Sequence, residues 1–186
     1  MDVKALAIPD VKLIAPPRIE DDRGFFSETY RKKDLAAAGI ADEFVQDNHS
    51  LSRPAGVIRG LHFQTDPHAQ GKLVRVVRGA ILDVAVDIRR GSPTFGQHVA
   101  VELTAENWLQ LWVPIGFAHG FCTLTPETEV IYKVTSYYDQ AADRGIAFDD
   151  PELAIVWPVT ADSAVVSAKD RRHPRLSDLP DHFGYP

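Results

Sequence analysis

Two polar side chains interrupt a strongly apolar segment between Gly56 and Phe63, which reads Gly-Val-Ile-Arg-Gly-Leu-His-Phe. Its β-branched and aromatic residues are typical of a buried strand, where an unpaired charge is costly. Two interpretations remain open. In the first, the strand lines a polar cavity, where His62 is a catalytic base and Arg59 holds an anionic substrate. In the second, His62 is a hydrogen-bonded core histidine and Arg59 forms a salt bridge at a sheet edge.

The spacing of Arg59 and His62 restricts the first interpretation. The two residues are three positions apart, so in a regular strand they point to opposite faces. If both face one cavity, a bulge or bend near Gly60 must redirect one of them.

A second histidine, His119, follows a Pro-x-Gly turn at the start of a predicted strand, a placement typical of a barrel mouth. Histidine acts as a base near neutral pH when a carboxylate orients its other ring nitrogen, but the sequence alone does not identify that carboxylate. Four histidines could supply metal ligands: His49, His62, His68 and His119. Gln64 stands two residues after His62, so there is no His-x-His pair and a metal site is poorly supported.

Several cations and tyrosines could bind a phosphorylated ligand. The cations are Arg23, Arg59, Lys72 and Lys169. Each alone is typical of a solvated surface charge, whereas together they suit a diphosphate. No Walker loop and no Gly-x-Gly-x-x-Gly motif is present, which argues against a glycine-rich nucleotide loop. Tyr132 and Tyr138 could donate a proton or stack on a base, whereas Tyr137 is predicted to pack on the core.

These residues lie on short strands separated by turn signals, a pattern that predicts an all-β sandwich or barrel. The predicted strands are 11–15, 25–30, 44–51, 56–63, 73–78, 80–88, 97–103, 109–113, 118–124 and 129–138. A helix is predicted over 31–39, before a glycine stop, and one helical turn over 178–183. Four consecutive polar residues, 46–49, indicate that the strand 44–51 faces a ligand. Strands do not alternate with long helices, which argues against a parallel α/β sheet.

Composition indicates a single soluble globular domain. The chain has 186 residues, of which 45% are hydrophobic and 25% are charged. A net charge of -6 argues against a nucleic-acid partner or an anionic membrane. The one cysteine, Cys122, excludes an intrachain disulfide, favours a cytoplasmic location and is expected to be a core residue. We expect no signal peptide and no membrane span.

Five motifs, in order along the chain, resemble those of the dTDP-4-dehydrorhamnose 3,5-epimerase family. They are Arg-Gly-Leu-His-Phe-Gln (59–64), Gln-Gly-Lys-Leu-Val-Arg (70–75), Pro-x-Gly-Phe-Ala-His-Gly-Phe (114–121), Tyr-Lys-Val-Thr-x-Tyr-Tyr (132–138) and Ser-Ala-Lys-Asp (167–170). The likeness extends from about Arg23 to Asp170. It implies an all-β, cupin-type jelly-roll barrel with a few short peripheral helices. The expected domain is 1–186, with a barrel core of about 44–157 on which the N-terminal strands and C-terminal tail pack.

The resemblance implies an isomerase that inverts C3 and C5 of dTDP-4-dehydro-6-deoxy-D-glucose, giving dTDP-4-dehydro-L-rhamnose. The 4-keto group acidifies both C–H bonds, so no cofactor and no metal are expected. His62 would be the base, oriented by Asp170. Lys72 would stabilise the enolate, and Tyr132 would donate a proton on the opposite face. We expect a homodimer that binds the dTDP-sugar as its substrate.

Substrate-binding residues follow from the same resemblance. It assigns the diphosphate to Arg23 and Arg59, the nucleotide and sugar to Glu28, Gln46, Asp47 and Asn48, thymine to Tyr138, and further contacts to His119, Asp143 and Lys169. Asp143 replaces a glutamate typical of the family, so its contact is shorter by one methylene. Arg23 and Glu28 could reach the site of the neighbouring subunit, and we expect Asp83 to pair with His119.

Other functions remain open from the sequence. Relatives in antibiotic-sugar pathways invert one carbon, and a cupin could bind a sugar nucleotide without turnover. A metal-dependent oxygenase and a 4-keto-sugar 3,4-isomerase fit the motifs less well. The His62–Asp170 pair and Tyr132 favour catalysis, because a binding protein needs no acid and base together.

Overall fold

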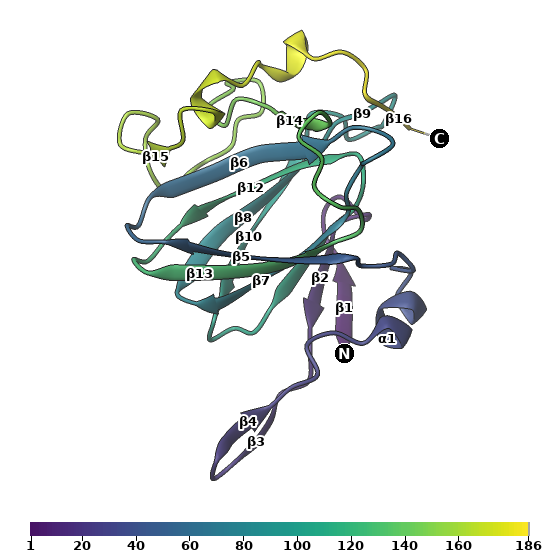
Figure 1. Ribbon diagram of the computed structural model, residues 1–186, viewed down its shortest axis with the longest axis vertical. Coiled ribbons are helices and arrows are strands. Elements are labelled where there is room, and N and C mark those ends of the chain that lie inside the picture. The colour runs from purple at the N-terminus through teal and green to yellow at the C-terminus, as the bar shows by residue number, and fades with distance from the viewer. Residues whose placement is uncertain (186) are drawn as a thin grey trace.

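A computed structural model describes residues 1–185 and consists mainly of two antiparallel sheets that face each other (Figure 1). The first sheet has the order β1 (Asp2–Ala5), β2 (Lys12–Ala15), β11 (Gln110–Val113), β7 (Lys72–Arg78), β13 (Thr128–Val134) and β5 (Gln46–Ser52). The second has the order β10 (His98–Thr104), β8 (Ala80–Asp87), β12 (Phe117–Thr123), β6 (Val57–Gln64) and β14 (Asp143–Gly145). The short strand β15 (Val165–Val166) pairs in parallel with β6. Neighbouring strands are thus often distant in sequence, as in a jelly roll.

Smaller elements surround the sheets. They are the hairpin β3 (Ile19–Asp21) and β4 (Gly24–Phe26), the helix α1 (Lys32–Ala37), the pair β9 (Arg89–Arg90) and β16 (Phe183–Gly184), and the 3-10 helices η1 (Asp170–Arg172) and η2 (Leu176–Asp178). The β3–β4 hairpin projects away from the sheets, whereas the C-terminal segment lies over β6 and β14 (Figure 1).

Apolar side chains fill both faces of the second sheet, which explains the continuous burial of β12. One core cluster lies between the sheets and includes Val74, Leu111 and Phe117. A second cluster includes Leu61 of β6 and Leu176 of η2, so the C-terminal segment packs on the outer face of this sheet. A strand covered on both sides reads as an apolar run rather than as an alternation. The C-terminal segment therefore packs on the barrel.

The expected all-β architecture is confirmed, with differences at the ends of elements. The predicted strand 25–30 ends at Phe26, and the predicted strand 129–138 ends at Val134. Tyr137 therefore lies in a loop and is 66% exposed, so its predicted place in the core was wrong. The predicted helical turn 178–183 is displaced to Leu176–Asp178.

The predicted helix 31–39 corresponds to α1, and its end has a local cause. Gly39 follows the helix with a φ of 80°, a conformation that glycine adopts without strain. Cys122 is fully buried, as expected, and burial raises the pKa of its thiol to about 11. None of the helices within residues 1–185 is both long and apolar enough to cross a membrane.

Candidate active site

A bulge in β6 brings Arg59 and His62 to the same side. His119 of β12 pairs with His62, and Phe121 pairs with Arg59, so two residues of β6 stand opposite one residue of β12. Gly60 has a φ of 133°, and a Cβ there would lie 2.5 Å from the Cα of the facing strand. Only glycine fits this combination of backbone and contact. The predicted bulge near Gly60 is confirmed.

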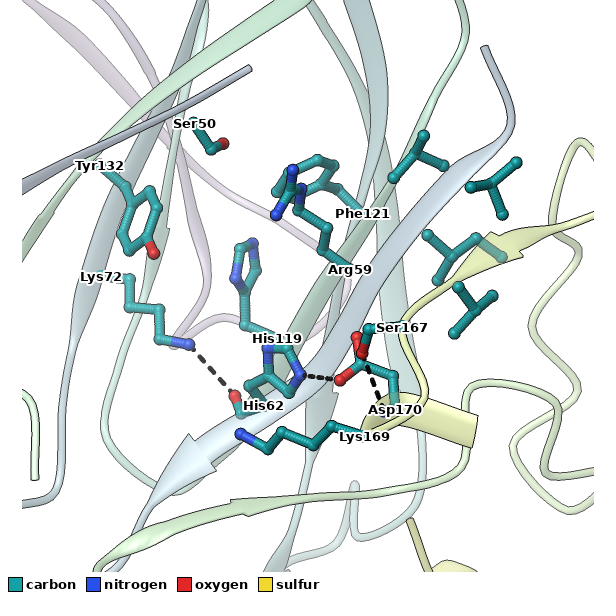
Figure 2. Close-up of a pocket in the computed structure, with 14 residues that line it drawn as sticks. Ser50, Arg59, His62, Lys72, His119, Phe121, Tyr132, Ser167, Lys169 and Asp170 are labelled. Carbon is teal, nitrogen blue, oxygen red and sulfur yellow. Dashed lines mark hydrogen bonds and ion pairs between the residues drawn. The ribbon is translucent and has the colours of Figure 1, made fainter. Parts of the chain in front are cut away.

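The bulge opens onto a cavity of about 420 Å³ between the two sheets (Figure 2). The first sheet contributes Ser50, Lys72 and Tyr132, and the second contributes Arg59, His62, His119 and Phe121. Ser167, Lys169 and Asp170 close one side, and Val57, Ile58, Val165 and Val166 line the rest. Polar groups from both sheets thus converge on one largely apolar cavity, an arrangement typical of a small-molecule site.

Asp170 and His62 form a close pair although they are 108 residues apart. The Nε2 of His62 lies 2.8 Å from the Oδ1 of Asp170, the contact that the family resemblance implies. The N–H of Gly60 donates to Oδ2 at 3.3 Å, and the N–H of Asp170 donates to the Oγ of Ser167 at 3.0 Å. Both carboxylate oxygen atoms of Asp170 and its backbone N–H therefore have hydrogen-bond partners, which fix the side chain in place.

The protonation states of the pair follow from these contacts. Burial raises the pKa of Asp170, but contacts with His173, His62 and the N–H of Gly60 together hold this pKa well below its usual range. An ionised carboxylate only accepts hydrogen bonds, so the Nε2 of His62 carries the proton and Nδ1 carries the lone pair. Burial lowers the pKa of His62, Asp170 opposes this, and the charges of Lys72 and Lys169 add to the lowering. The neutral imidazole is thus suited to act as a base.

Lys72 and Tyr132 face this pair from the first sheet (Figure 2). The Nζ of Lys72 donates to the backbone oxygen of His62 at 3.1 Å. Burial lowers the pKa of Lys72 to about 8, against the opposing charges of Asp83 and Asp143. Burial also raises the pKa of Tyr132, which keeps its phenol protonated. A base on one sheet therefore faces a cation and a proton donor on the other.

A second histidine–carboxylate pair lies deeper in the same sheet. The Nε2 of His119 is 2.7 Å from the Oδ1 of Asp83, and both side chains are buried. The expected pairing of these two residues is confirmed. His119 lines the cavity and Asp83 lies behind it.

An adjoining cavity of about 300 Å³ shares His62, Lys72, Tyr132 and Lys169 with the first. The polar residues that line this cavity but not the first include Gln46, Asn48, Tyr138 and Asp143. Asp143 accepts a hydrogen bond from the hydroxyl of Tyr138 at 3.1 Å and forms an ion pair with Lys169. The structure therefore places these four polar residues next to the catalytic candidates.

Three predicted binding residues lie elsewhere in this chain. Asp47 points to the opposite face of β5 from Gln46 and Asn48 because side chains alternate along a strand, and it pairs with Lys133 at 2.8 Å. Its grouping with its two neighbours is not supported by this geometry. The structure likewise does not bring Arg23 and Glu28 to the cavity.

Arg23 and Glu28 belong to the projecting N-terminal segment. The side chain of Arg23 is 89% exposed at the tip of the β3–β4 hairpin and pairs with Asp21 at 2.5 Å. Glu28 pairs with Arg31 at 3.3 Å. Within one chain, both residues make local contacts only.

The structure also adds residues that sequence reasoning missed. Ser50 lines the cavity two positions after Asn48, so the alternation of β5 could have identified it. Ser167 opens the Ser-Ala-Lys-Asp motif and holds the backbone of Asp170. His173 contacts the same carboxylate from one 3-10 turn further along the chain. Nothing in the sequence distinguishes it from a surface histidine of a polar tail.

Among residues 1–185, one group combines enough ligand atoms to hold a metal ion: His62, Asp170 and His173, whose ligand atoms lie within 4.8 Å of one another. The Nε2 of His62 already donates to Asp170, so a metal would have to displace that proton. The position where a His-x-His pair would place its second ligand holds Gln64. The amide of Gln64 donates to the backbone oxygen atoms of His68 and Tyr137 at 2.6 and 3.1 Å.

Comparison with known proteins agrees with this geometry. The sequence model of the dTDP-4-dehydrorhamnose 3,5-epimerase family matches residues 5–178. A protein of that name from Sinorhizobium fredii is 51% identical over all of this chain and 94% of its own length.

Solved structures give the same result. A dTDP-4-dehydrorhamnose 3,5-epimerase from Bacillus anthracis, with TDP and pyrophosphate bound, is 53% identical with a TM-score of 0.90 over 94% of this chain and 98% of its own. A dTDP-6-deoxy-D-glucose-3,5-epimerase from Legionella pneumophila, in complex with dTDP-4-keto-L-rhamnose, is 44% identical with a TM-score of 0.95 over 100% and 98%. The expected cupin-type fold is thereby confirmed. This chain belongs to the dTDP-4-dehydrorhamnose 3,5-epimerase family.

Proposed function

We propose that this protein inverts C3 and C5 of dTDP-4-dehydro-6-deoxy-D-glucose and releases dTDP-4-dehydro-L-rhamnose. One observation carries the proposal. A base paired with a carboxylate, His62 with Asp170, lies on one side of the cavity, and a cation and a phenol, Lys72 and Tyr132, lie on the other. Inversion of a carbon requires removal of a proton from one face and delivery of a proton to the opposite face.

The residues supply each step of this reaction. The Nδ1 of His62 takes the proton from a carbon next to the 4-keto group, and the C–H electron pair moves to the keto oxygen. The ammonium of Lys72 stabilises the enolate, an interaction that contributes roughly 3 kcal/mol in comparable sites. We assign Tyr132 to C5, where it delivers its proton to the face opposite His62, and the carbonyl forms again. Solvent then restores both groups, so the cycle consumes no cofactor.

The remaining polar groups suit the nucleotide. Arg59 and Lys169 line the cavities as cations for the diphosphate, against a net protein charge of -6. Tyr138 is half-exposed beside Asp143 and offers a ring for thymine to stack on. Gln46 and Asn48 offer amide groups to the nucleotide and sugar, and His119 offers a ring nitrogen to the sugar.

Arg23 and Glu28 would complete the site from a second subunit. They lie on a projecting segment, next to Phe25 and Phe26, which are 52% and 65% exposed. Exposed aromatic residues on an extended hairpin suit insertion into a neighbouring copy. We therefore propose a homodimer in which each hairpin reaches the other cavity. A cytoplasmic location would agree with a single buried thiol and a nucleotide substrate.

The proposal is tested by incubating the protein with the keto-sugar nucleotide in D2O and following C3 and C5 by NMR. We expect deuterium at both carbons and accumulation of the inverted sugar. Deuterium at one carbon only would identify a single-carbon epimerase. Tight binding of dTDP without any deuterium incorporation would identify a binding protein and reject catalysis.

A further inference from the structure

His173 lies next to the catalytic candidates without lining the cavity. It follows the 3-10 helix η1, which begins with Asp170, and its side chain is only 10% exposed. Its ring packs against the backbone of β14 at Gly145, where any Cβ would overlap the imidazole. The ring also meets that of His62 edge to face, with centroids 5.6 Å apart and planes at 76°. Burial and these two packing contacts fix its orientation.

The Nε2 of His173 is a buried polar atom with no hydrogen-bond partner within 1–185. The acceptor that it faces is the Oδ1 of Asp170, at 3.5 Å, which is also the oxygen that contacts His62 at 2.8 Å. An unprotonated Nε2 would place a lone pair against a carboxylate, which is unfavourable, whereas a protonated Nε2 places a donor there. The contact is long for a hydrogen bond in the free protein, as catalytic contacts often are before substrate binds.

We propose that His173 is a positioning residue: its Nε2–H holds the Oδ1 of Asp170, so that the carboxylate stays between two imidazoles and keeps His62 in one orientation. This inference rests on the proposed function. When His62 accepts a proton from the sugar, the carboxylate is drawn toward it. A second donor on the same oxygen limits that movement and shares the negative charge.

Other charged groups act on the same pair and must be separated from His173. Lys72 approaches His62 from β7, and Lys169 precedes η1. Both lower the pKa of His62. Within residues 1–185 their polar contacts are with the backbone of His62 and with Asp143, not with His173, so substitution of His173 leaves these contacts in place.

The test compares His173→Phe, which fills the space but donates nothing, with His173→Gln, whose amide nitrogen reaches the position of Nε2. His182→Phe is the matched control, because His182 also lies in the C-terminal segment and packs against Phe63, with centroids 5.5 Å apart and planes tilted by 57°. For His173→Phe we expect kcat to fall by about tenfold to a hundredfold, with KM unchanged because His173 does not touch the substrate. His173→Gln should recover most of this loss.

The pH profile adds a readout that a merely structural role would not move. Without the second donor, Asp170 attracts the protonated form of His62 more strongly, so the acidic limb of kcat/KM should move to higher pH in His173→Phe. The acidic limb should return to its wild-type pH in His173→Gln and should not move in His182→Phe. Wild-type kinetics and an unmoved acidic limb in His173→Phe would overturn the proposal. Absence of deuterium exchange at C3 and C5 in the wild-type protein would instead overturn the proposed function.

A measurement on the wild-type protein covers the case in which His173→Phe does not fold. Long-range proton–nitrogen NMR on protein labelled with ¹⁵N-histidine reports which ring nitrogen of each histidine carries the proton. We expect a protonated Nε2 for His173, with its shift altered by Asp170→Asn. An unprotonated Nε2 in the wild type would contradict the proposal.

Discussion

At the scale of single residues, the surroundings of Asp170, His62 and Lys72 shift their pKa values in directions that suit one reaction. Asp170 remains ionised because donors surround it, and it selects the tautomer of His62, whose neutral form is favoured by burial. Burial lowers the pKa of Lys72 to about 8, so its ammonium loses a proton more readily than that of a surface lysine. The same burial strengthens its interaction with a developing enolate.

Replacement of Asp170 tests the residue pair. Asp170→Asn keeps the shape of the side chain but removes the charge that selects the Nε2–H tautomer of His62. We expect kcat to fall by about a hundredfold or more, measured by deuterium incorporation. Asp162→Asn, at an exposed position, is the control. An unchanged rate in Asp170→Asn would exclude His62 as a base oriented by this carboxylate.

The pKa of Lys72 predicts the alkaline limb of activity. The ammonium is charged below a pKa of about 8 and neutral above it, so kcat/KM should decline as the pH rises through this value. Lys72→Arg carries a charge that persists above pH 8 because a guanidinium does not titrate there. The limb should therefore disappear in this variant, whatever its overall rate. A limb at the same pH in Lys72→Arg would assign it to another group.

At the scale of elements, the site depends on one irregularity in an otherwise regular strand. The bulge at Gly60 turns Arg59 and His62 to one side, and the close approach of β12 leaves no space for a side chain. The sequence predicted this bulge because a spacing of three residues conflicts with a period of two.

Gly60→Ala should therefore disturb both stability and activity. A left-handed backbone costs a residue other than glycine about 1–2 kcal/mol, and the contact with β12 adds to this. Gly91→Ala is the control, because Gly91 also has a positive φ, 86°, but a Cβ there would meet its nearest atom only at 4.0 Å. Chemical denaturation should show a larger loss of stability for Gly60→Ala than for Gly91→Ala. Equal losses would mean that the strands separate easily at the bulge.

Sequence prediction failed where the geometry of a strand or turn, rather than the type of a residue, decides which contact forms. The resemblance to the epimerase family, carried by five motifs in order, related His62 to Asp170 across 108 residues, which no local pattern could do. Asp47 was grouped with its neighbours although alternation sends it to the other face. His173 was missed because its contact depends on the 3-10 turn of η1 and the packing on β14, which no local pattern encodes.

At the scale of the whole molecule, two of the three expected binding residues that lie outside the cavity of one chain belong to the projecting N-terminal segment. Arg23 lies at the turn of the β3–β4 hairpin, which projects away from the sheets (Figure 1), and neither Arg23 nor Glu28 lines the cavity. A second subunit would supply both residues and cover the exposed aromatic residues of the hairpin.

Mixed dimers test this arrangement. A dimer of one Arg23→Ala chain and one His62→Ala chain contains one site with both native residues, if Arg23 acts across the interface. It should show about half of the wild-type activity, since one of two equivalent sites is intact. A dimer of His62→Ala and Asp170→Asn chains is the control, because both changes act within their own chain and neither site recovers. Failure of the first pair to recover activity would place Arg23 outside the neighbouring site.

The arrangement of acid and base on opposite sheets is tested most directly by Tyr132→Phe in D2O. Loss of the phenol removes the proton donor of one face and leaves His62, Asp170 and Lys72 intact. NMR should show that deuterium still enters C3, whereas inversion at C5 falls by about a hundredfold. Undiminished inversion at C5 in this variant would contradict the opposed-face mechanism.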